Sequence, residues 1–275
     1  MGIDEAYENL RRTIGTMGSV AVAFSGGVDS SFLCRVSHDM LADGAVAITV
    51  VSPMLPASEL EEAKALAAGV GIRHILLHEQ SIDAAVAENP PDRCYRCKKI
   101  EFSSILKTAA EMGIAHVLDG SNQDDLSDYR PGLRALSELG VRSPLREVGL
   151  RKADIRALSQ KLGLPTWDKP AFACLASRIP YGERITSEKL LRIDKAESYL
   201  RALGIRQVRV RSHHNLARIE VAQEERAKLC NPDIMDEVAA GLKSLGFLYV
   251  CMELQGYQTG SMNRTIATLG DTGRG

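Results

Sequence analysis

The chain has 275 residues, of which 45% are hydrophobic and 25% charged, a composition typical of a soluble globular protein with one large domain or two modest ones. The formal net charge of −1 argues against a broad basic surface for nucleic acid. No apolar run approaches the roughly 20 residues of a membrane helix. The first residues also lack a basic segment followed by an apolar one, so we expect no membrane contact, no secretion signal and a cytoplasmic location. Six cysteines in such a chain are not expected to form a disulfide framework.

Up to about residue 165, short apolar runs alternate with stretches of helical spacing. The apolar runs are rich in valine and isoleucine, which is typical of buried parallel strands. Strands that alternate with helices predict an α/β fold with a doubly wound, mainly parallel sheet. We expect strands at 20–24, 45–51, 74–78 and 116–120, and helices at 3–17, from 29, at 58–70, after Cys97 up to about 112, and at 151–162.

The pattern changes near Gly182, after a long proline-containing segment of the kind that is usually a functional loop or a linker. Thr186 is placed to cap a helix, and alternating strands at 207–211 and 217–221 predict a hairpin. A helix at 232–244 and a strand at 247–254 follow. We therefore expect an α/β domain at 1–180, a small α+β domain at 181–263 for substrate binding or oligomerisation, and a weakly ordered tail at 264–275.

The stretch from Ser25 to Ser30 lies between the first strand and the following helix. Gly26 and Gly27 allow the backbone to approach a phosphate closely, and the first amides of the helix are unpaired and favour an anion. Asp29 either caps the helix or holds Mg²⁺ beside the phosphates. The order of strand, glycine loop and helix predicts a phosphate site, with an ordinary glycine-rich turn as the alternative.

This loop is not the G-x-x-x-x-G-K-[ST] loop of many nucleotide triphosphatases. It matches S-G-G-x-D-S-[ST], the pyrophosphate loop of the ATP pyrophosphatase (PP-loop) superfamily, whose members grip the β- and γ-phosphates of ATP and release pyrophosphate. Further contacts are expected at the carboxyl ends of the strands, where open α/β sheets bind ligands. Ser52 follows the second strand, and a polar loop at 121–132 follows the fourth. That loop suits Mg²⁺ and phosphate, or it is a plain solvated loop.

Further motifs narrow the superfamily to one family. Together they resemble the LarE family, ATP-dependent sulfur transferases that help to build the nickel-pincer nucleotide cofactor of lactate racemase, and the resemblance runs from about residue 5 to 263. The motifs are Leu118-Asp-Gly120, Asp125, Asp128-Tyr-Arg-Pro-Gly132, Ser143-Pro-Leu-Arg146, Cys174-Leu-Ala-Ser-Arg178 and Pro180-Tyr-Gly182.

The resemblance implies a substrate, a pyridinium-3,5-dicarboxylate mononucleotide, and a homo-oligomer that transiently contacts other nickel-pincer biosynthesis proteins. ATP would adenylate one carboxylate, pyrophosphate would leave, and sulfur would displace AMP to give a thiocarboxylate. The implied ATP-binding residues are Ala23, Ser25, Gly26, Gly27, Asp29, Ser30, Ser52, Gly120, Asp125 and Arg130, with Mg²⁺ near Asp29 and Asp128. The implied residues for the substrate phosphate are Ser177, Arg178, Arg209 and Arg211, and the implied catalytic residues are Asp29, Cys94, Cys97, Cys174 and Arg178.

Arg209 and Arg211 alternate with core residues and so share one strand face, as a bidentate phosphate site requires; a solvated arginine pair is the alternative. Glu220 shares the exposed face of the next strand with Arg218, and it either orients an arginine or forms a surface pair.

The sulfur source is the second question that the sequence raises. The family is known in two forms, one that sacrifices the sulfur of a single cysteine and one that delivers an exogenous sulfide from a 4Fe-4S cluster on three cysteines. Cys94 and Cys97 form a C-x-x-C pair, which can bind two irons of one cluster but is weak evidence alone. Together with Cys174 it favours the cluster. Sacrificial use of Cys174, and a zinc or disulfide role for the pair, remain as alternatives.

Other activities of the PP-loop superfamily fit the sequence less well. A tRNA thiolation enzyme predicts a basic face and usually a further RNA-binding or zinc module, neither of which the sequence indicates. Amidating relatives have no need for the three cysteines. A non-catalytic nucleotide-binding or iron-sulfur carrier protein is the remaining alternative, and no sequence feature favours it.

Overall fold

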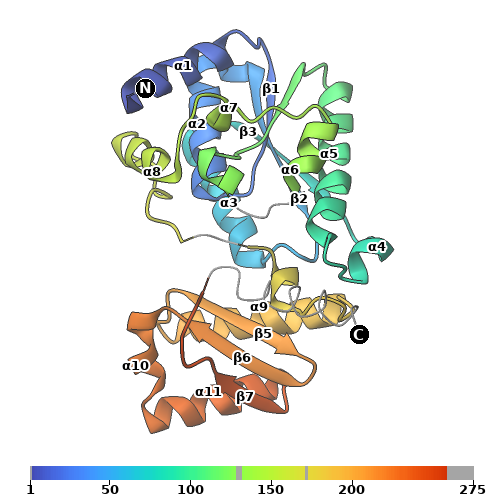
Figure 1. The fold of residues 1–275 in the computed structure, drawn as a ribbon, viewed down its shortest axis with the longest axis vertical. Helices are drawn as coiled ribbons and strands as arrows, with labels where there is room; N and C mark the ends of the chain where they lie inside the picture. Colours follow the sequence, from blue (N-terminus) through green and yellow to red (C-terminus); the bar gives the residue numbers. More distant parts are fainter. Residues whose placement is uncertain (1, 128–131, 171–172, 259–275) are drawn as a thin grey trace, which may run out of the picture. The chain divides into compact units, whose positions relative to one another are not determined.

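The computed structural model describes residues 2–127, 132–170 and 173–258, which fall into two compact units (Figure 1). Unit 1 comprises Met1–Ser52, Ala57–Gln80 and Asp92–Phe172. Unit 2 comprises Pro53–Pro56, Ser81–Pro91 and Ala173–Gly275. The boundary between the two units thus lies before Ala173, apart from the short segments 53–56 and 81–91, which belong to unit 2. No helix in the described ranges is both long and apolar enough to cross a membrane.

Unit 1 is built on a four-stranded sheet in the order β3-β2-β1-β4, in which every pair of neighbouring strands is parallel. Val20 of β1 lies opposite Ala45 of β2 on one side and His116 of β4 on the other. All four strands begin within one residue of their predicted starts. Their bounds are Val20–Ala23 (β1), Ala45–Val51 (β2), Arg73–His78 (β3) and His116–Leu118 (β4).

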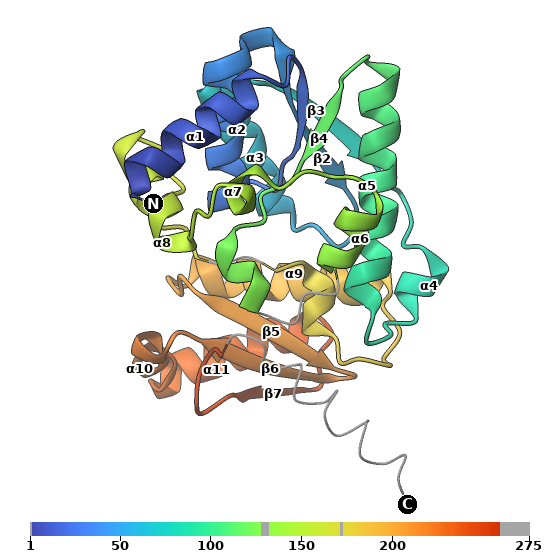
Figure 2. The same cartoon turned by 45° about the horizontal axis from the view of Figure 1, so that its top comes forward.

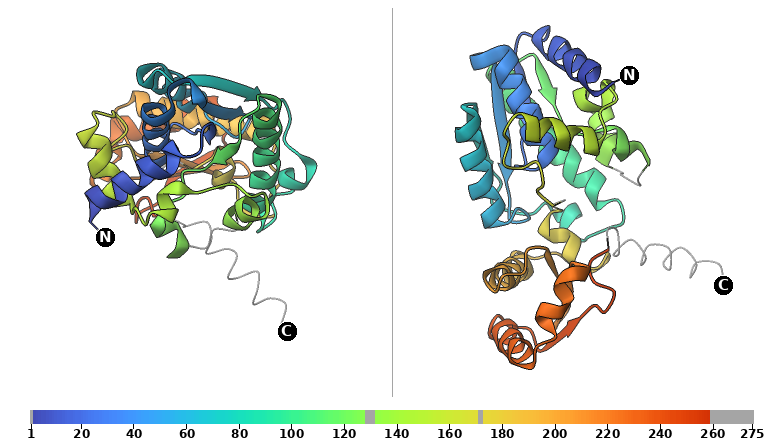
Figure 3. Two further views of the ribbon diagram at one scale, coloured as in Figure 1. Left: turned by 90° about the horizontal axis from the view of Figure 1, so that it is seen from above. Right: turned by 90° about the vertical axis from the view of Figure 1, so that its left-hand side faces the viewer.

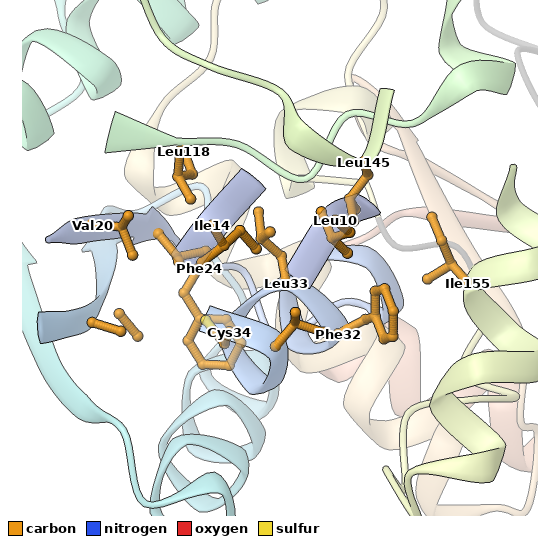
Figure 4. Packing of buried hydrophobic residues seen from close by; sticks show 14 of the residues in the cluster. Leu10, Ile14, Val20, Phe24, Phe32, Leu33, Cys34, Leu118, Leu145 and Ile155 are labelled. Atoms are coloured by element: carbon orange, nitrogen blue, oxygen red, sulfur yellow. The ribbon is translucent and has the colours of Figure 1, made fainter. Parts of the chain in front are cut away.

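Helices cover both faces of this sheet (Figure 3). On one face, Leu10, Phe32 and Ile155 pack with Val20 and its neighbours in a buried apolar cluster (Figure 4). On the other face, a second cluster joins the sheet to α5 and α6. The predicted α/β class with a parallel sheet is therefore confirmed. The helices of unit 1 are α1 (Ile3–Gly15), α2 (Val28–Leu41), α3 (Ala57–Val70), α5 (Arg93–Glu111), α6 (Gly132–Glu138), α7 (Pro144–Glu147) and α8 (Lys152–Lys161), with 3₁₀ turns η1 (Ala42–Gly44) and η2 (Gln123–Ser127).

Two details of these helices differ from the predictions. The residue that precedes α2 is Gly27, and Asp29 makes no capping bond because it is the second residue of the helix itself. The cysteine pair was expected to start in a loop, with the helix after Cys97. Instead α5 begins at Arg93, because Pro90 and Pro91 lie before the helix, where they disturb no helical hydrogen bond.

Unit 2 contains a three-stranded sheet in the order β5-β6-β7, with β5 and β6 antiparallel and β7 parallel to β6 (Figure 2). One face of this sheet packs on α9 and α11 through a single apolar cluster. Thr186 caps α9 as predicted, because its hydroxyl accepts from the Lys189 amide at 3.2 Å. The elements are α4 (Ala84–Ala87), η3 (Leu175–Arg178), α9 (Ser187–Ala202), β5 (Val208–His213), β6 (Leu216–Val221), η4 (Gln223–Glu225), α10 (Arg226–Leu229), α11 (Pro232–Ser244) and β7 (Tyr249–Met252).

An ion pair between Arg178 and Glu197 lies in the interior of unit 2, with both side chains fully buried. Arg178 donates from Nε to Glu197 Oε1 at 2.8 Å and from Nη2 to Oε2 at 3.1 Å, so the contact is bidentate. The Val210 amide donates to Glu197 Oε1 at 3.0 Å. Burial alone raises the pKa of Glu197, but the charge and hydrogen bonds of Arg178 outweigh it and the pKa is lowered. Glu197 therefore joins α9, η3 and β5 as a buried carboxylate.

Substituting Glu197→Ala is expected to reduce the free energy of unfolding by about 3–5 kcal/mol, because the Arg178 charge is left buried without its partner. Urea unfolding followed by circular dichroism measures the change. Glu188→Ala, at an exposed position of the same helix, is the control and is expected to stay within about 0.5 kcal/mol of the wild type. Equal losses in the two variants would contradict the structural role of the pair.

Candidate functional site

The loop between β1 and α2 has the geometry of an anion site. Gly26 has a φ of +69°, which glycine adopts without strain. The Ser30 hydroxyl lies 3.1 Å from the Ser25 hydroxyl and accepts from the Ser25 amide at 3.3 Å, which ties the two ends of the loop together. No side chain in the described ranges caps the N-terminus of α2, so its first amides are available to a ligand.

Two glycines allow other elements to contact this loop. A Cβ on Gly26 would lie 3.1 Å from the Cβ of Ala63 on α3. A Cβ on Gly120, just after β4, would lie 3.1 Å from the Ser30 amide and 3.3 Å from the Cβ of Asp29. The structure therefore brings Gly120 into contact with the phosphate loop, as their shared role in the sequence predictions requires. Ala23 and Ser52 lie at the carboxyl ends of β1 and β2, at the same edge of the sheet.

Asp29 combines one strong contact with one unused oxygen. Its Oδ2 accepts from Lys152 Nζ at 2.5 Å. Its Oδ1 is buried and has no hydrogen-bond partner among the described residues. Burial raises the pKa of Asp29, and Lys152 only partly opposes this. A buried, unpartnered carboxylate oxygen beside an anion site fits the donor set of Mg²⁺. Sequence reasoning missed Lys152, since the first residue of a helix gives no signal of a contact 123 positions away.

The polar loop after β4 is ordered by its own carboxylates. Asp125 is buried, and its Oδ2 accepts from the Asn122 amide at 2.9 Å. Its charge also raises the pKa of Asp29, which places it near the phosphate loop. Asp128 and Arg130, predicted for Mg²⁺ and ATP, lie outside the described residues.

The three candidate cluster cysteines lie on two different units. Cys94 and Cys97 occupy the first turns of α5, three positions apart and thus on one helix face, and both are at least partly exposed. Cys174 immediately precedes η3 and is exposed. None of the six cysteines forms a disulfide, and Cys34 is buried in the core. Within each unit, the described residues contain no group of three or more His, Cys, Asp or Glu side chains that could hold a metal ion.

Arg178 was predicted to bind the substrate phosphate, but its side chain is fully buried. Besides Glu197, it donates from Nη1 to the carbonyls of Ala173 and Cys174 and to the Ser177 hydroxyl. These contacts occupy the guanidinium with protein groups, and the phosphate contact implied by the resemblance stays a prediction. Arg178 fixes the backbone of the loop that carries Cys174. The motif located the residue but not its partner, which lies 19 positions further along the chain.

Arg209 and Arg211 lie on one face of β5, as their alternation predicted, but they are buried rather than solvated. Glu220 orients an arginine, because its Oε2 accepts from Arg211 Nη2 at 2.7 Å and its Oε1 from Arg218 Nη2 at 2.9 Å. Arg211 also donates to the Ser177 carbonyl at 3.0 Å. Burial and the nearby Arg178 lower the pKa of Arg209 to about 10. The result is a partly neutralised group of buried arginines, which is suited to an anion.

Comparison with known proteins places these features in a family. No protein-family profile matches the sequence. The chain is 46% identical over 265 residues to an uncharacterized protein of Synechocystis sp., and the match covers 96% of this chain and 99% of that protein. It is 41% identical over 251 residues to the pyridinium-3,5-bisthiocarboxylic acid mononucleotide synthase of Lactiplantibacillus plantarum, with 90% of each chain covered.

A more distant relative is the tRNA-specific 2-thiouridylase MnmA of Rickettsia massiliae, 27% identical over 191 residues that span 55% of this chain and 52% of that protein. The Synechocystis and Lactiplantibacillus relatives match almost the whole chain, whereas the Rickettsia relative matches about half of it. A partial match of this kind is expected between members of one superfamily that share a domain. The chain therefore belongs to the LarE family of ATP-dependent sulfur transferases, within the PP-loop superfamily.

Proposed function

We propose that the protein uses ATP to convert a carboxylate of a pyridinium-3,5-dicarboxylate mononucleotide into a thiocarboxylate, as a step in nickel-pincer nucleotide synthesis. The observation that carries this proposal is the strand, glycine loop and helix of unit 1, beside a buried Asp29 oxygen that has no hydrogen-bond partner in the part of the chain that the structure describes. The substrate class comes from the synthase of Lactiplantibacillus plantarum. A cytoplasmic homo-oligomer is part of the same proposal.

The first step needs a site that stabilises departing pyrophosphate. A carboxylate oxygen of the substrate attacks the α-phosphorus of ATP, the bond from that phosphorus to the bridging oxygen of the β-phosphate breaks, and an acyl adenylate forms. The loop amides and the N-terminus of α2 can hold the β- and γ-phosphates. Asp29 would hold Mg²⁺, which supplies charge neutralisation on the phosphates when bound. Lys152 orients Asp29 from the opposite side.

The Asp29→Asn substitution is expected to slow substrate-dependent exchange of pyrophosphate into ATP by about 100-fold, the size typical of removing one group that stabilises transition-state charge. The variant keeps the shape of the side chain but removes the charge that would attract Mg²⁺. Asp39→Asn, on the exposed face of the same helix, is the control and should exchange at the wild-type rate. Wild-type exchange in Asp29→Asn would remove Asp29 from the site.

The buried arginines of unit 2 are proposed to bind the phosphate of the mononucleotide. Arginine holds phosphate through two parallel hydrogen bonds. Glu220 and the Ser177 carbonyl hold Arg211 in one orientation, and Arg209 lies under the ring of Tyr257, 5.5 Å from its centroid. Ser177 belongs to the same proposal, since this residue is partly exposed and its carbonyl contacts Arg211. Pre-oriented arginines lose little side-chain entropy when the phosphate binds.

Arg209→Gln is expected to weaken binding of the mononucleotide by roughly 10–100-fold, which corresponds to a charged hydrogen bond of about 1.5–3 kcal/mol. Binding of ATP should not change. Isothermal titration with each ligand measures both, and Arg206→Gln, at an exposed neighbouring position, serves as the control. A parallel loss of ATP and mononucleotide affinity would indicate general disruption instead of a phosphate site.

We further propose that Cys94, Cys97 and Cys174 bind a 4Fe-4S cluster. None of the three forms a disulfide, all are at least partly exposed, and Cys94 and Cys97 share one helix face, which suits iron ligation. Arg93 Nη2 lies 4.0 Å from Cys94 Sγ, so a positive charge stands beside this member of the pair. When bound, the cluster would supply an exogenous sulfide on its fourth iron. Arg178 and Ser177 fix the backbone that presents Cys174, through bonds to the Cys174 carbonyl at 2.9 and 2.8 Å.

Protein purified without oxygen is expected to contain about four iron atoms and an equal amount of acid-labile sulfide per chain, with broad absorption at about 400 nm. The Cys97→Ala variant should lose both, while Cys230→Ala, at an exposed cysteine of unit 2, should keep them. Iron-free protein after anaerobic reconstitution would overturn the cluster. A mass loss of about 34 Da at Cys174 after one turnover would then support the sacrificial route, in which the cysteine becomes dehydroalanine.

Thiolation of tRNA is the second candidate, and its support is the 27% identity to the Rickettsia massiliae thiouridylase. That relative matches only about half of the chain, and the net charge of −1 does not favour an RNA-binding surface. The mononucleotide reading is therefore preferred.

A further inference from the structure

Lys169 contacts the phosphate loop without being able to bind phosphate itself. Its Nζ donates to the Gly26 carbonyl at 3.1 Å and to Glu59 Oε2 at 2.7 Å, and it lies 2.7 Å from Glu62 Oε2. An ammonium group has three N–H donors, so these three acceptors account for all of them. The Lys169 side chain is 14% exposed. Two carboxylates also more than offset its charge, and the group therefore offers an anion neither a free donor nor net positive charge.

The bond from Lys169 to the Gly26 carbonyl also sets the direction of the next amide, the Gly27 N–H. In a trans peptide the carbonyl oxygen and the following N–H point in opposite directions. A carbonyl of Gly26 held toward Lys169 thus directs the Gly27 N–H away from Lys169. Gly27 is the residue that precedes α2, and none of the described residues accepts a hydrogen bond from its amide. This amide is one of the donors that a phosphate at the helix N-terminus would use.

The peptide that Lys169 holds lies between two glycines, Gly26 and Gly27. Gly26 has φ +69° and Gly27 has φ −80° and ψ 170°, and glycine accepts many backbone angles at similar energy. Without an external contact, the peptide between two glycines samples several orientations. Ala63 packs against Gly26, but this contact does not set the direction of the Gly26 carbonyl. A fixed charge-assisted bond to the carbonyl selects one orientation before a ligand arrives.

Lys169 is itself held by α8. Arg156 donates from Nη1 to the Trp167 carbonyl at 2.6 Å and from Nη2 to the Lys169 carbonyl at 2.7 Å. The same helix carries Lys152, which contacts Asp29. One helix thus supports the phosphate loop at two points, the Gly26 peptide and the Asp29 carboxylate.

We infer that Lys169 is a positioning residue that orients the Gly26–Gly27 peptide, so that the Gly27 N–H is directed at a phosphate of ATP before the nucleotide binds. The inference rests on the proposed ATP site. Its effect is specific to ligands that carry a polyphosphate, since adenosine has no group for this amide.

The test compares ATP, pyrophosphate and adenosine by isothermal titration with the full-length protein. Lys169→Met is expected to weaken ATP and pyrophosphate about 10-fold and to leave adenosine within about twofold of the wild type, because one charge-assisted contact that fixes a donor is lost. Lys169→Arg, which can still donate to the Gly26 carbonyl, should recover most of the loss. Lys161→Met, an exposed lysine of α8 that pairs only with Asp4 at 3.4 Å in the described ranges, is the control.

Equal weakening of ATP and adenosine in Lys169→Met would show a general structural role and overturn the inference. Unchanged ATP and pyrophosphate affinity would overturn it as well. A wild-type protein that binds no ATP would instead reject the proposed function. Binding of adenosine by the variant also reports that the site has folded.

Discussion

The phosphate loop is constrained by how closely α3 and the end of β4 approach its backbone. Only a hydrogen atom fits at Gly26 without displacing Ala63 of α3, and only a hydrogen atom fits at Gly120 without displacing the Ser30 amide. These contacts bring the end of β4 and the side of α3 against a loop whose own ends are tied by Ser25 and Ser30. Larger residues at either glycine would force the sheet edge and the loop apart. The anion site therefore depends on close backbone packing more than on any one charged side chain.

Charged side chains then stabilise what the packing allows. Lys152 and Lys169 each reach the loop region from the chain that follows β4, and each is partnered by carboxylates. Lys169, whose three donors all meet protein acceptors, holds the loop backbone, and Lys152 holds one oxygen of Asp29. Asp29 shows the complementary arrangement, since one oxygen is braced and the other is left without a partner among the described residues. The oxygen that Lys152 holds keeps the Asp29 carboxylate in place, and the other oxygen would be the one to bind a divalent cation.

The buried arginines of unit 2 also divide into one that holds the protein backbone and two that are proposed to bind a ligand. Arg178 is fully occupied by Glu197 and by the backbone around Cys174, so it holds a loop in place. Arg209 and Arg211 are held from the side by an aromatic ring, a carbonyl and Glu220. Burying several arginines together costs desolvation and mutual repulsion, which lowers the pKa of Arg209. An anionic ligand at this face would relieve that repulsion.

The sequence by itself determined the strands, the phosphate loop and the family, because these depend on local patterns. Valine-rich runs are typical of buried parallel strands, and a glycine loop between a strand and a helix is typical of a phosphate site. It also placed Arg209 and Arg211 on one strand face, since side chains alternate along any strand. Tertiary structure decided which of the recognised residues face a ligand and which face the protein. The local motif identified Arg178 as a candidate phosphate ligand, and only the fold shows its buried ion pair with Glu197. Lys152 and Lys169 carried no signal, because a lysine acquires a role only when the fold brings an acceptor to it across 100 or more positions of chain.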